Sequence, residues 1–421
     1  MKEQKRIYQI EDKLPVNLLL PLSLQHTFAM FGASILVPII FGINPGIVLF
    51  MNGIGTLLFI FITKGKAPAY LGSSFAFLAP GTAIIANQGF QYAQGAFIFV
   101  GLLGCLLAFI IYKFGTKWID VVLPPAAMGA VVALIGFELA TNTVTGGSIG
   151  ANLMTETSQT ADWIVFLITL LTAVIGSVSF NGFLSTIPIL IAIVVGYIVS
   201  IMFNMVDFTP VTNAKLFTMP LFQAPKFSWE AMIAMLPVIL VITSEHISHQ
   251  VVTSNIVGKD LIKEPGLHRS IFADNFSSAL SGLVGGVPTT TYGENIGVMA
   301  ITGVYSVQVI AGAAVFSIIM AFFGPLAAFI QTIPGNVIGG VTFLLYGMIG
   351  TSGIRLLVDK QVDYSKNVNL ILTSVIFITG LSGLKMQFGS IQLSGMVLAS
   401  VVAVVLSGFM ALLNKIGILH D

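Results

Sequence analysis

Apolar runs recur along this chain almost without interruption, and this feature limits its fold more than any other. Of its 421 residues, 56% are hydrophobic and 8% are charged, whereas a soluble protein carries roughly 25% charged residues. An apolar run of about 20 residues can cross a bilayer as a helix. The sequence therefore predicts an integral membrane protein built from helices, with no separate soluble domain.

Fourteen apolar runs can be delimited from the sequence. They lie at about 14–41, 46–62, 75–86, 95–112, 121–141, 163–179, 183–204, 230–252, 271–287, 295–303, 305–330, 334–357, 368–384 and 391–413. The third and the tenth runs are too short to span a bilayer, and each follows a short polar stretch. We therefore expect two broken spans, in which a few extended residues precede a half-helix.

The tenth run carries a carboxylate at its start. Residues 288–303 read PTTTYGENIGVMAITG, with Glu294 next to Gly293 and Asn295. Non-helical backbone is tolerated at membrane depth only where protein or a water-filled cavity covers it, and an ionisable residue there indicates function. The alternative is a turn outside the membrane with Glu294 in water. We favour the first interpretation, because the third run repeats the same break.

The two short runs are seven places apart in the order of runs, which a sevenfold unit used twice would produce. At a constant offset of 210, residues 123–134 (LPPAAMGAVVAL) resemble residues 333–344 (IPGNVIGGVTFL), and Pro124 aligns with Pro334. A unit with an odd number of spans enters the membrane from the opposite side when it is repeated. The expected fold is an all-α polytopic membrane protein of 14 segments in two inverted repeats, with half-helices in segments 3 and 10.

The distribution of lysine and arginine predicts the orientation of these segments. With the N-terminus in the cytoplasm, fifteen of the 18 Lys and Arg residues fall on the inner side, and Lys215, Lys226 and Lys385 fall outside. This asymmetry follows the positive-inside rule. Both termini are therefore expected in the cytoplasm, with residues 205–229 as an outer connection between the two halves.

The eighth run places two titratable side chains on one helical face. Glu245 and His249 are four residues apart in MLPVILVITSEHISHQVV, so they could share a proton. A purely structural pair is the alternative. His246 lies about 100° around the helix from Glu245 and is interpreted as packing or polar filler.

A metal site is a different interpretation of the same residues, because carboxylates and imidazoles bind zinc. The spacing argues against it, since there is no H-E-x-x-H motif and Cys105 is the only cysteine. We expect no metal and no cofactor.

Other polar and aromatic residues fall in or beside the broken segments. His26 and its neighbour Gln25 lie within the first run, and we expect them to support the broken segments rather than to contact a ligand. Tyr292 and Phe75 could present aromatic faces to a flat ligand, although such residues usually serve packing.

These groups define a class of ligand. Two carboxylates repel an anion, whereas the N-termini of two half-helices offer backbone N–H donors. The ligand should therefore be neutral and carry N–H donors beside carbonyl acceptors. A planar nucleobase fits this description, and uracil in particular presents both groups on adjacent edges.

Several motifs resemble those of the nucleobase–ascorbate transporter family over essentially the whole chain. E-N-x-G-x-x-x-x-T-G, from Glu294 to Gly303, matches the signature of that family, and Gln25-His26 matches its first-span element. The bacterial branch that carries uracil is similar in four further passages, AYLGSSFAF (69–77), SEHISHQ (244–250), PGLHRS (265–270) and PTTTYGENIG (288–297).

The resemblance implies a core domain, which holds the substrate, and a gate domain. The core would comprise residues 1–118 (segments 1–4) and 229–331 (segments 8–11), and the gate residues 119–228 (segments 5–7 with the outer linker) and 332–421 (segments 12–14). By the same resemblance, Glu245 and Glu294 would bind uracil by side chain, Phe75 and Gly293 by backbone N–H, and His249 would assist binding or proton coupling. The remaining roles implied are lining residues, Tyr292 and Tyr346, and supporting residues, Gln25, His26 and Asn295.

The expected activity is uracil:proton symport across the bacterial cytoplasmic membrane, without covalent chemistry, by a homodimer that binds no nucleic acid. A xanthine or purine permease of the same family is the nearest alternative. An anion carrier or channel of similar architecture and a metal-dependent membrane enzyme are the alternatives from other classes.

Overall fold

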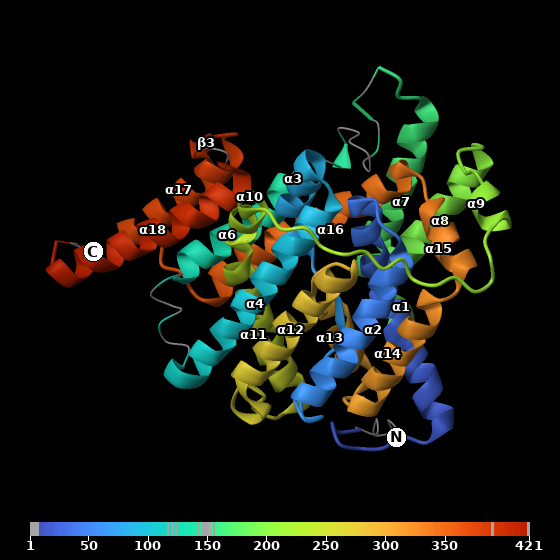
Figure 1. The fold of residues 1–421 in the computed structure, drawn as a ribbon, viewed down its shortest axis with the longest axis horizontal. Helices are drawn as coiled ribbons and strands as arrows, with labels where there is room; N and C mark the ends of the chain where they lie inside the picture. Colours follow the sequence, from blue (N-terminus) through green and yellow to red (C-terminus); the bar gives the residue numbers. More distant parts are fainter. Residues whose placement is uncertain are drawn as a thin grey trace.

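The computed structural model describes residues 8–115, 118, 122, 124–140, 143–144, 151, 153–154, 156–388 and 391–418, and the chain is helical through most of this length (Figure 1). The helices of the first half are α1 (Val16–Phe41), α2 (Pro45–Ile62), η1 (Phe75–Phe77), α3 (Leu78–Gln88), α4 (Phe90–Phe114), α6 (Pro125–Ala140), α7 (Thr160–Ser179), η3 (Gly182–Thr186), α8 (Pro188–Met202) and α9 (Thr209–Thr212). Strand β1 (Leu71–Ser73) precedes η1.

The second half begins at α10. Its helices are α10 (Trp229–Met235), α11 (Val238–Val257), η4 (Ile262–Gly266), α12 (Leu267–Val284), α13 (Gly293–Thr302), α14 (Val307–Ala321), α15 (Gly324–Gln331), α16 (Gly335–Asp359), α17 (Asn367–Leu381) and α18 (Gly395–Ile416). Its strands are β2 (Thr289–Thr291), β3 (Lys385–Phe388) and β4 (Ile391–Ser394).

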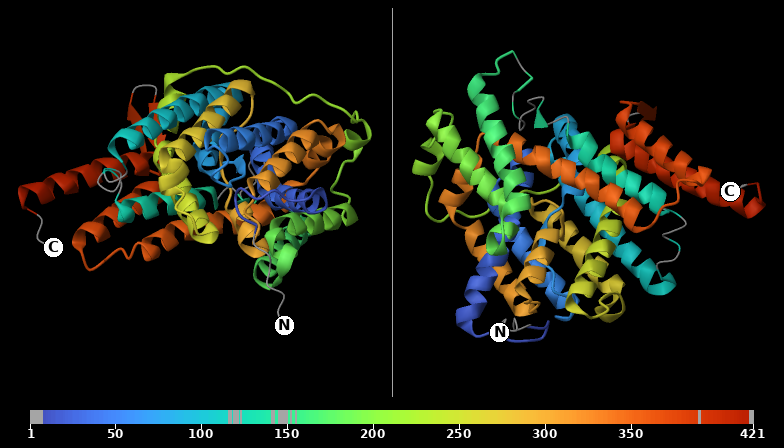
Figure 2. Two further views of the ribbon diagram at one scale, coloured as in Figure 1. Left: turned by 90° about the horizontal axis from the view of Figure 1, so that it is seen from below. Right: turned by 180° about the vertical axis from the view of Figure 1, so that it is seen from behind.

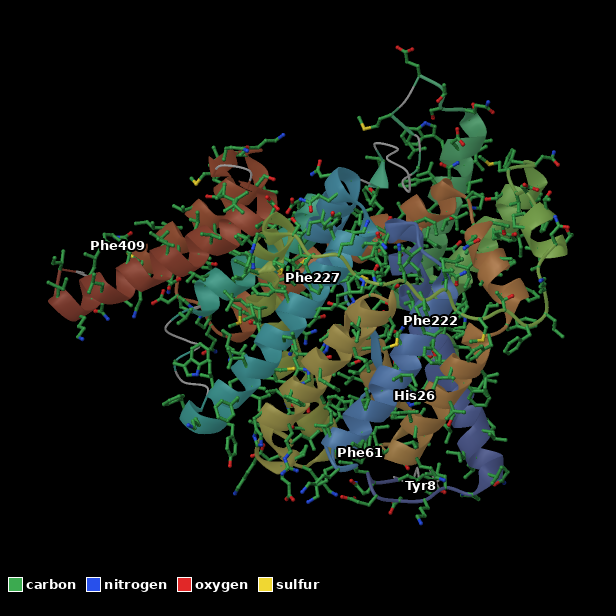
Figure 3. The ribbon with its side chains drawn as sticks, viewed as in Figure 1. Tyr8, His26, Phe61, Phe222, Phe227 and Phe409 are labelled. Atoms are coloured by element: carbon green, nitrogen blue, oxygen red, sulfur yellow. The ribbon has the colours of Figure 1, made fainter. Side chains whose placement is uncertain are left out.

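Seven helical stretches in the described residues are long and apolar enough to cross a bilayer, one of them formed by α10 and α11 together. Their length and composition agree with the predicted polytopic membrane protein. Large apolar side chains lie exposed on the periphery, as Phe61 (80%) and Phe409 (52%) do in Figure 3, whereas His26 lies inside at 1%. Apolar side chains on the outer surface and polar side chains in the interior are expected of a protein embedded in a lipid bilayer. The count of 14 segments and their inversion stay predictions.

The structure shifts several of the expected boundaries. The run expected at 305–330 is two helices, α14 and α15, because the chain turns at Phe322 and Phe323. The run expected at 391–413 starts later, because residues 391–394 pair with β3 as a hairpin instead of joining α18. The beginning of the run expected at 121–141 lies partly outside the described residues.

The two similar passages that suggested a repeat lie at the starts of two helices. α6 begins directly after Pro124 and α16 directly after Pro334, at the predicted offset. The two helices pack closely because glycines face each other: a Cβ on Gly136 would lie 2.1 Å from the Tyr346 carbonyl oxygen, and one on Gly353 would lie 2.2 Å from the Ala133 nitrogen. Small residues thus let the two backbones approach as they do in membrane helix pairs.

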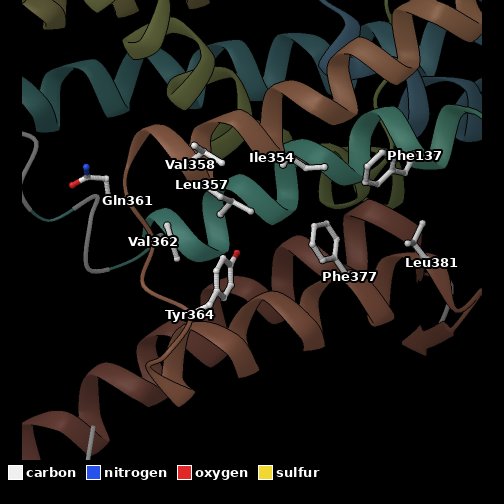
Figure 4. Close-up of a pocket in the computed structure, with 9 residues that line it drawn as sticks. All are labelled: Phe137, Ile354, Leu357, Val358, Gln361, Val362, Tyr364, Phe377 and Leu381. Carbon is white, nitrogen blue, oxygen red and sulfur yellow. The ribbon is translucent and has the colours of Figure 1, made fainter.

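Two groups of helices can be followed in Figures 1 and 2. In one, α4 packs on α12 and α14 packs on α1 and α2; in the other, α16 packs on α6 and α7, and α17 packs on α18 and α6. A cavity of about 640 Å³ lies between α6, α16 and α17, and it is mainly apolar. Figure 4 shows its lining residues: Phe137, Ile354, Leu357, Val358, Gln361, Val362, Tyr364, Phe377 and Leu381.

The predicted connection between the halves contains α9 and then an extended segment that crosses the ends of several helices (Figures 1 and 2). Its backbone N–H groups donate to other elements: Thr218 to Phe322 O at 3.0 Å, Gln223 to Val284 O at 3.1 Å and Lys226 to Gln91 O at 2.9 Å. These bonds fix the connection along helices of the first group.

Candidate functional site

The two polar stretches that interrupt the predicted spans meet as a two-stranded ribbon. β1 and β2 pair antiparallel, with Leu71 opposite Thr291 and Ser73 opposite Thr289, and all six residues are buried. The pairing continues past both ends, where Ser74 N donates to Pro288 O at 2.9 Å and Tyr292 N donates to Tyr70 O at 3.0 Å. Each extended stretch thus satisfies backbone groups of the other at a depth where water is scarce.

Hydroxyl groups of neighbouring helices satisfy the outer edges of this ribbon. Thr56 of α2 accepts from Leu71 N at 2.9 Å, and Ser278 of α12 both accepts from Thr289 N at 3.0 Å and donates to Thr289 O at 2.8 Å. An unpaired strand edge is unfavourable inside a membrane protein, because its polar groups have no water to bond. The serine and threonine content of α2 and α12 therefore has a structural reason.

Gly72 is required where the ribbon passes beneath an aromatic ring. A Cβ at position 72 would lie 2.3 Å from Cζ of Tyr292, so any side chain there would displace the ring. The Tyr292 hydroxyl donates to Ser73 O at 3.0 Å. Tyr292 is therefore a buried contact between the two strands, and its role in lining the ligand site stays a prediction.

A half-helix leaves each end of the ribbon. The η1–α3 unit begins at Phe75 and α13 begins at Gly293, and neither N-terminus receives a hydrogen bond from a capping side chain. The first N–H groups of a helix have no partner within the helix and carry a partial positive charge. Their expected role as donors to a ligand stays a prediction.

The residues expected to contact a ligand are the accessible ones in this region. Phe75, Glu245, His249 and Glu294 are partly exposed and Gly293 is exposed, whereas the strand residues between them are buried. Within the described residues, neither the Glu245 nor the Glu294 carboxyl group receives a hydrogen bond from another residue. The charges of Glu294 and Asp274 both act on the Glu245 carboxyl group. Such a site favours protons or neutral N–H donors over anions.

His249 connects α11 to the second half-helix. Its Nδ1 lies 2.9 Å from Thr291 Oγ1, and a Cβ placed on Gly293 would lie 3.6 Å from its Nε2. Glu245 lies one turn away on the same helix. The structure thus brings His249 and Gly293 together, but within the described chain the hydrogen bond of His249 is to Thr291 and not to Glu245.

Asn295 and His26 are in contact, as their expected supporting role requires. The Asn295 amide nitrogen lies 3.0 Å from His26 Nδ1 and donates to His26 O at 3.1 Å. This contact ties the first turn of α13 to α1. Gln25 is partly exposed, and its side chain forms no hydrogen bond within the described residues.

Tyr346 lies on α16, the helix that packs on α6. It is 4% exposed, and it is the one expected lining residue that comes from the second group of helices.

The sequence interpretation missed a buried pair beside the site. His246 Nδ1 lies 3.1 Å from Asp274 Oδ2, and both side chains are almost fully buried. His246 is therefore more than packing, because it joins α11 to α12. The occurrence of Asp274 in an apolar helix was the available signal, since buried carboxylates need partners. In the described part of the chain, no group of three or more His, Cys, Asp or Glu residues could hold a metal ion.

Comparison with known proteins gives one consistent result. The family model Xan_ur_permease, described as Permease family, matches residues 18–389. The uracil permease of Escherichia coli K12 is 53% identical over 96% of this chain and 94% of its own, and that of Bacillus subtilis is 45% identical over 91% of each. The uracil permease of Paenibacillus larvae is 49% identical over 98% of each chain.

Solved structures share the fold at low identity. The transmembrane domain of the cyanobacterial bicarbonate transporter BicA superposes with a TM-score of 0.61 at 16% identity, covering 97% of this chain and 100% of that domain. The murine anion transporter Slc26a9 superposes with a TM-score of 0.72 at 11% identity, covering 96% of this chain and 69% of the other. At these identities the likeness concerns the fold alone.

Proposed function

This chain belongs to the Permease family whose model it matches, and from that premise we propose that it imports uracil across the bacterial cytoplasmic membrane together with protons. Membership of a permease family confirms that the chain is a transporter rather than an enzyme. The observation that carries the proposed substrate is the accessible pair of carboxylates, Glu245 and Glu294, beside two uncapped half-helix N-termini.

Recognition follows from the chemistry of these groups. Carboxylates of Glu245 and Glu294 accept N–H donors of the base, and the N–H groups of Phe75 and Gly293 donate to its carbonyl oxygens. The relatives named uracil permeases support uracil among the bases that fit. Xanthine is the second candidate, because it presents the same alternation of N–H and C=O.

Proton coupling is the second part of the proposal. Glu245 and His249 lie one helical turn apart, and the charges of Glu294 and Asp274 act on the Glu245 carboxyl group, which favours uptake of a proton together with a neutral base. Glu245 is the group through which binding and protonation are linked. His249, held by Thr291, transmits the state of this helix to the start of α13.

Transport requires the site to open alternately to each side. We assign this motion to a core (residues 1–118 and 229–331) that moves against a gate (residues 119–228 and 332–421), arranged as 14 segments in two inverted repeats, in a homodimer. Two features support the assignment: the helices pack in two groups, and the order of strand, half-helix and helix occurs twice. Tyr346 would then close the site from the gate side.

Uptake into proteoliposomes tests the substrate and the coupling together. Labelled uracil should accumulate and be displaced by excess unlabelled uracil more effectively than by xanthine or thymine. Uracil should also drive H⁺ into the vesicles, and His249→Ala should blunt the pH dependence of uptake while some binding remains. The absence of uracil-driven H⁺ flux in the wild type would refute symport, and preferential displacement by xanthine would replace the substrate.

Labelling of single cysteines tests the orientation, in which both termini are cytoplasmic. On a Cys105→Ser background, a membrane-impermeant thiol reagent added outside should label Asn213→Cys in the connection and leave Lys64→Cys unlabelled. The reverse pattern would invert the topology.

A further inference from the structure

A second cavity, lined by many polar residues, lies apart from the paired strands, between α3, α10 and the start of α18. Its volume is about 290 Å³, and it is lined by polar residues from five elements. These polar residues are Asn87, Gln88, Glu138, Glu230, Gln387 and Ser394. We call it the outer cavity, because the proposed orientation places the end of α3 and the β3–β4 hairpin outside the membrane.

The outer cavity and the proposed uracil site lie along one helical unit. Ala79, Ala83 and Asn87 line the cavity on successive turns of α3, which follows directly on η1. Twelve residues of helix span about 18 Å. The η1–α3 unit therefore runs from the backbone donor at Phe75 to the outer cavity.

Each of the two proposed moving parts contributes one carboxylate to the outer cavity. Glu230 comes from α10 in the core, and its Oε2 accepts from the Ser228 hydroxyl. Glu138 comes from α6 in the gate, and its Oε2 accepts from Met396 N at 2.7 Å. Both side chains are partly exposed and are held in position by these bonds.

We propose that the outer cavity is a transient binding site for the substrate on its way to the paired strands. Its ligand is a neutral, planar base with N–H donors beside carbonyl acceptors. The Glu230 carboxylate accepts an N–H of the base, and the side-chain amides of Gln88 and Gln387 complement its remaining polar groups. A volume of about 290 Å³ is at the lower limit for small-molecule sites and holds one such base.

This inference rests on the proposed function. It makes a kinetic prediction that the proposed uracil site at the paired strands (the central site) does not make by itself. A transient site on the path changes the rates of arrival and departure equally, so the equilibrium affinity of the central site does not depend on it. A defect in the outer cavity should therefore lower kcat/KM for uptake without changing the equilibrium Kd for uracil.

Two variants test the outer cavity by different means. Glu230→Gln removes the charged acceptor, and Ala83→Phe fills the cavity from an exposed position on α3. Glu156→Gln is the matched control, because Glu156 is an exposed carboxylate on the same proposed side and does not line the cavity. Initial uptake of labelled uracil by right-side-out vesicles gives kcat/KM, and calorimetry on purified protein gives Kd.

We expect kcat/KM to fall about fivefold to tenfold in Glu230→Gln, as for loss of one partly solvated charged hydrogen bond, and at least as much in Ala83→Phe. Kd should stay within about twofold of the wild type, and Glu156→Gln should match the wild type in both quantities. Unchanged kcat/KM in both cavity variants would overturn the inference, as would a parallel rise in Kd. Failure of the wild type to bind uracil would instead refute the proposed function.

Discussion

The first unit (β1 with η1–α3) and the second unit (β2 with α13) share the order of strand and half-helix but differ in the polarity of their side chains. Counted from the last strand residue, Glu294 and Asn295 of the second unit correspond to Ala76 and Phe77 of the first. Phe77 is fully buried, with its ring edge-on to Phe97 at 5.7 Å, whereas Asn295 is held by polar contacts to His26. One unit is thus anchored by packing and the other by hydrogen bonds.

This difference indicates how a repeated element can support a site that is not symmetric. Both units supply an uncapped helix N-terminus, so both can donate to a ligand through the backbone. Only the second unit adds a carboxylate and the contact with His249. The first unit supplies only a backbone donor, so its side chains need only hold it in place. Packing of buried apolar side chains is sufficient for this. Four predictions test this division of roles.

The largest effect is expected on stability, from Phe77→Ala in the first unit. Removing a buried phenylalanine ring leaves a cavity and costs about 3–5 kcal/mol in the free energy of unfolding. The melting temperature in detergent should fall clearly, whereas Phe61→Ala should change it little, because Phe61 is 80% exposed. A melting temperature equal to that of the wild type would show that the first unit is not anchored by packing.

The next effect concerns binding by the second unit. Glu294→Gln and Glu245→Gln should each weaken uracil binding by about 10–150-fold, because a charge-assisted hydrogen bond contributes roughly 1.5–3 kcal/mol. Calorimetry measures this directly, with Glu156→Gln as the control for loss of an exposed charge. Wild-type affinity in both folded variants would exclude these carboxylates from the uracil site.

A smaller effect is expected from the polar anchor of the second unit. Asn295→Ala and His26→Ala should each destabilise the protein, and a double-mutant cycle should give a coupling energy of about 1 kcal/mol. Thermal unfolding of the four proteins yields this value. If the two effects were simply additive, the contact would not anchor α13 to α1.

The smallest effect is expected where the segments leading to both units are joined at the proposed cytoplasmic surface. Lys66, just before β1, donates a hydrogen bond to Glu264, which lies before α12, and this partner lowers the pKa of the Glu264 carboxyl below 4.5. A carboxyl group whose pKa is lowered in the folded protein contributes stability at pH values above its ordinary pKa. This stability is lost as the pH falls through the lowered pKa. Both groups are exposed, so the contribution is small.

Lys66→Met should therefore reduce the melting temperature slightly at pH 7, and the difference from the wild type should vanish near pH 3. Lys263→Met is the control, because Lys263 takes part in no ion pair within the described residues. A difference that persisted unchanged at pH 3 would assign the effect of Lys66 to packing of its alkyl chain instead.

The sequence by itself determined where the chain must break and what chemistry lies there. Two apolar runs too short for a bilayer, each preceded by polar residues, required broken spans, and the structure places β1 with η1–α3 and β2 with α13 at those points. The carboxylate at Glu294 and the helix starts after Pro124 and Pro334 could be read locally, whereas α13 begins at Gly293, two residues before the expected run at 295–303. Length, proline and charge act within a few residues, so the sequence carries this information directly.

Only the tertiary structure decided which distant groups meet. The pairing of β1 with β2, the ring of Tyr292 over Gly72 and the bond from His246 to Asp274 join segments that are far apart along the chain. Helical spacing suggested Glu245 as the partner of His249, but Thr291 occupies that place, because the ribbon brings a hydroxyl to the imidazole. Such partners depend on how helices pack and cross, and this geometry is set by the whole set of side chains rather than by any local pattern.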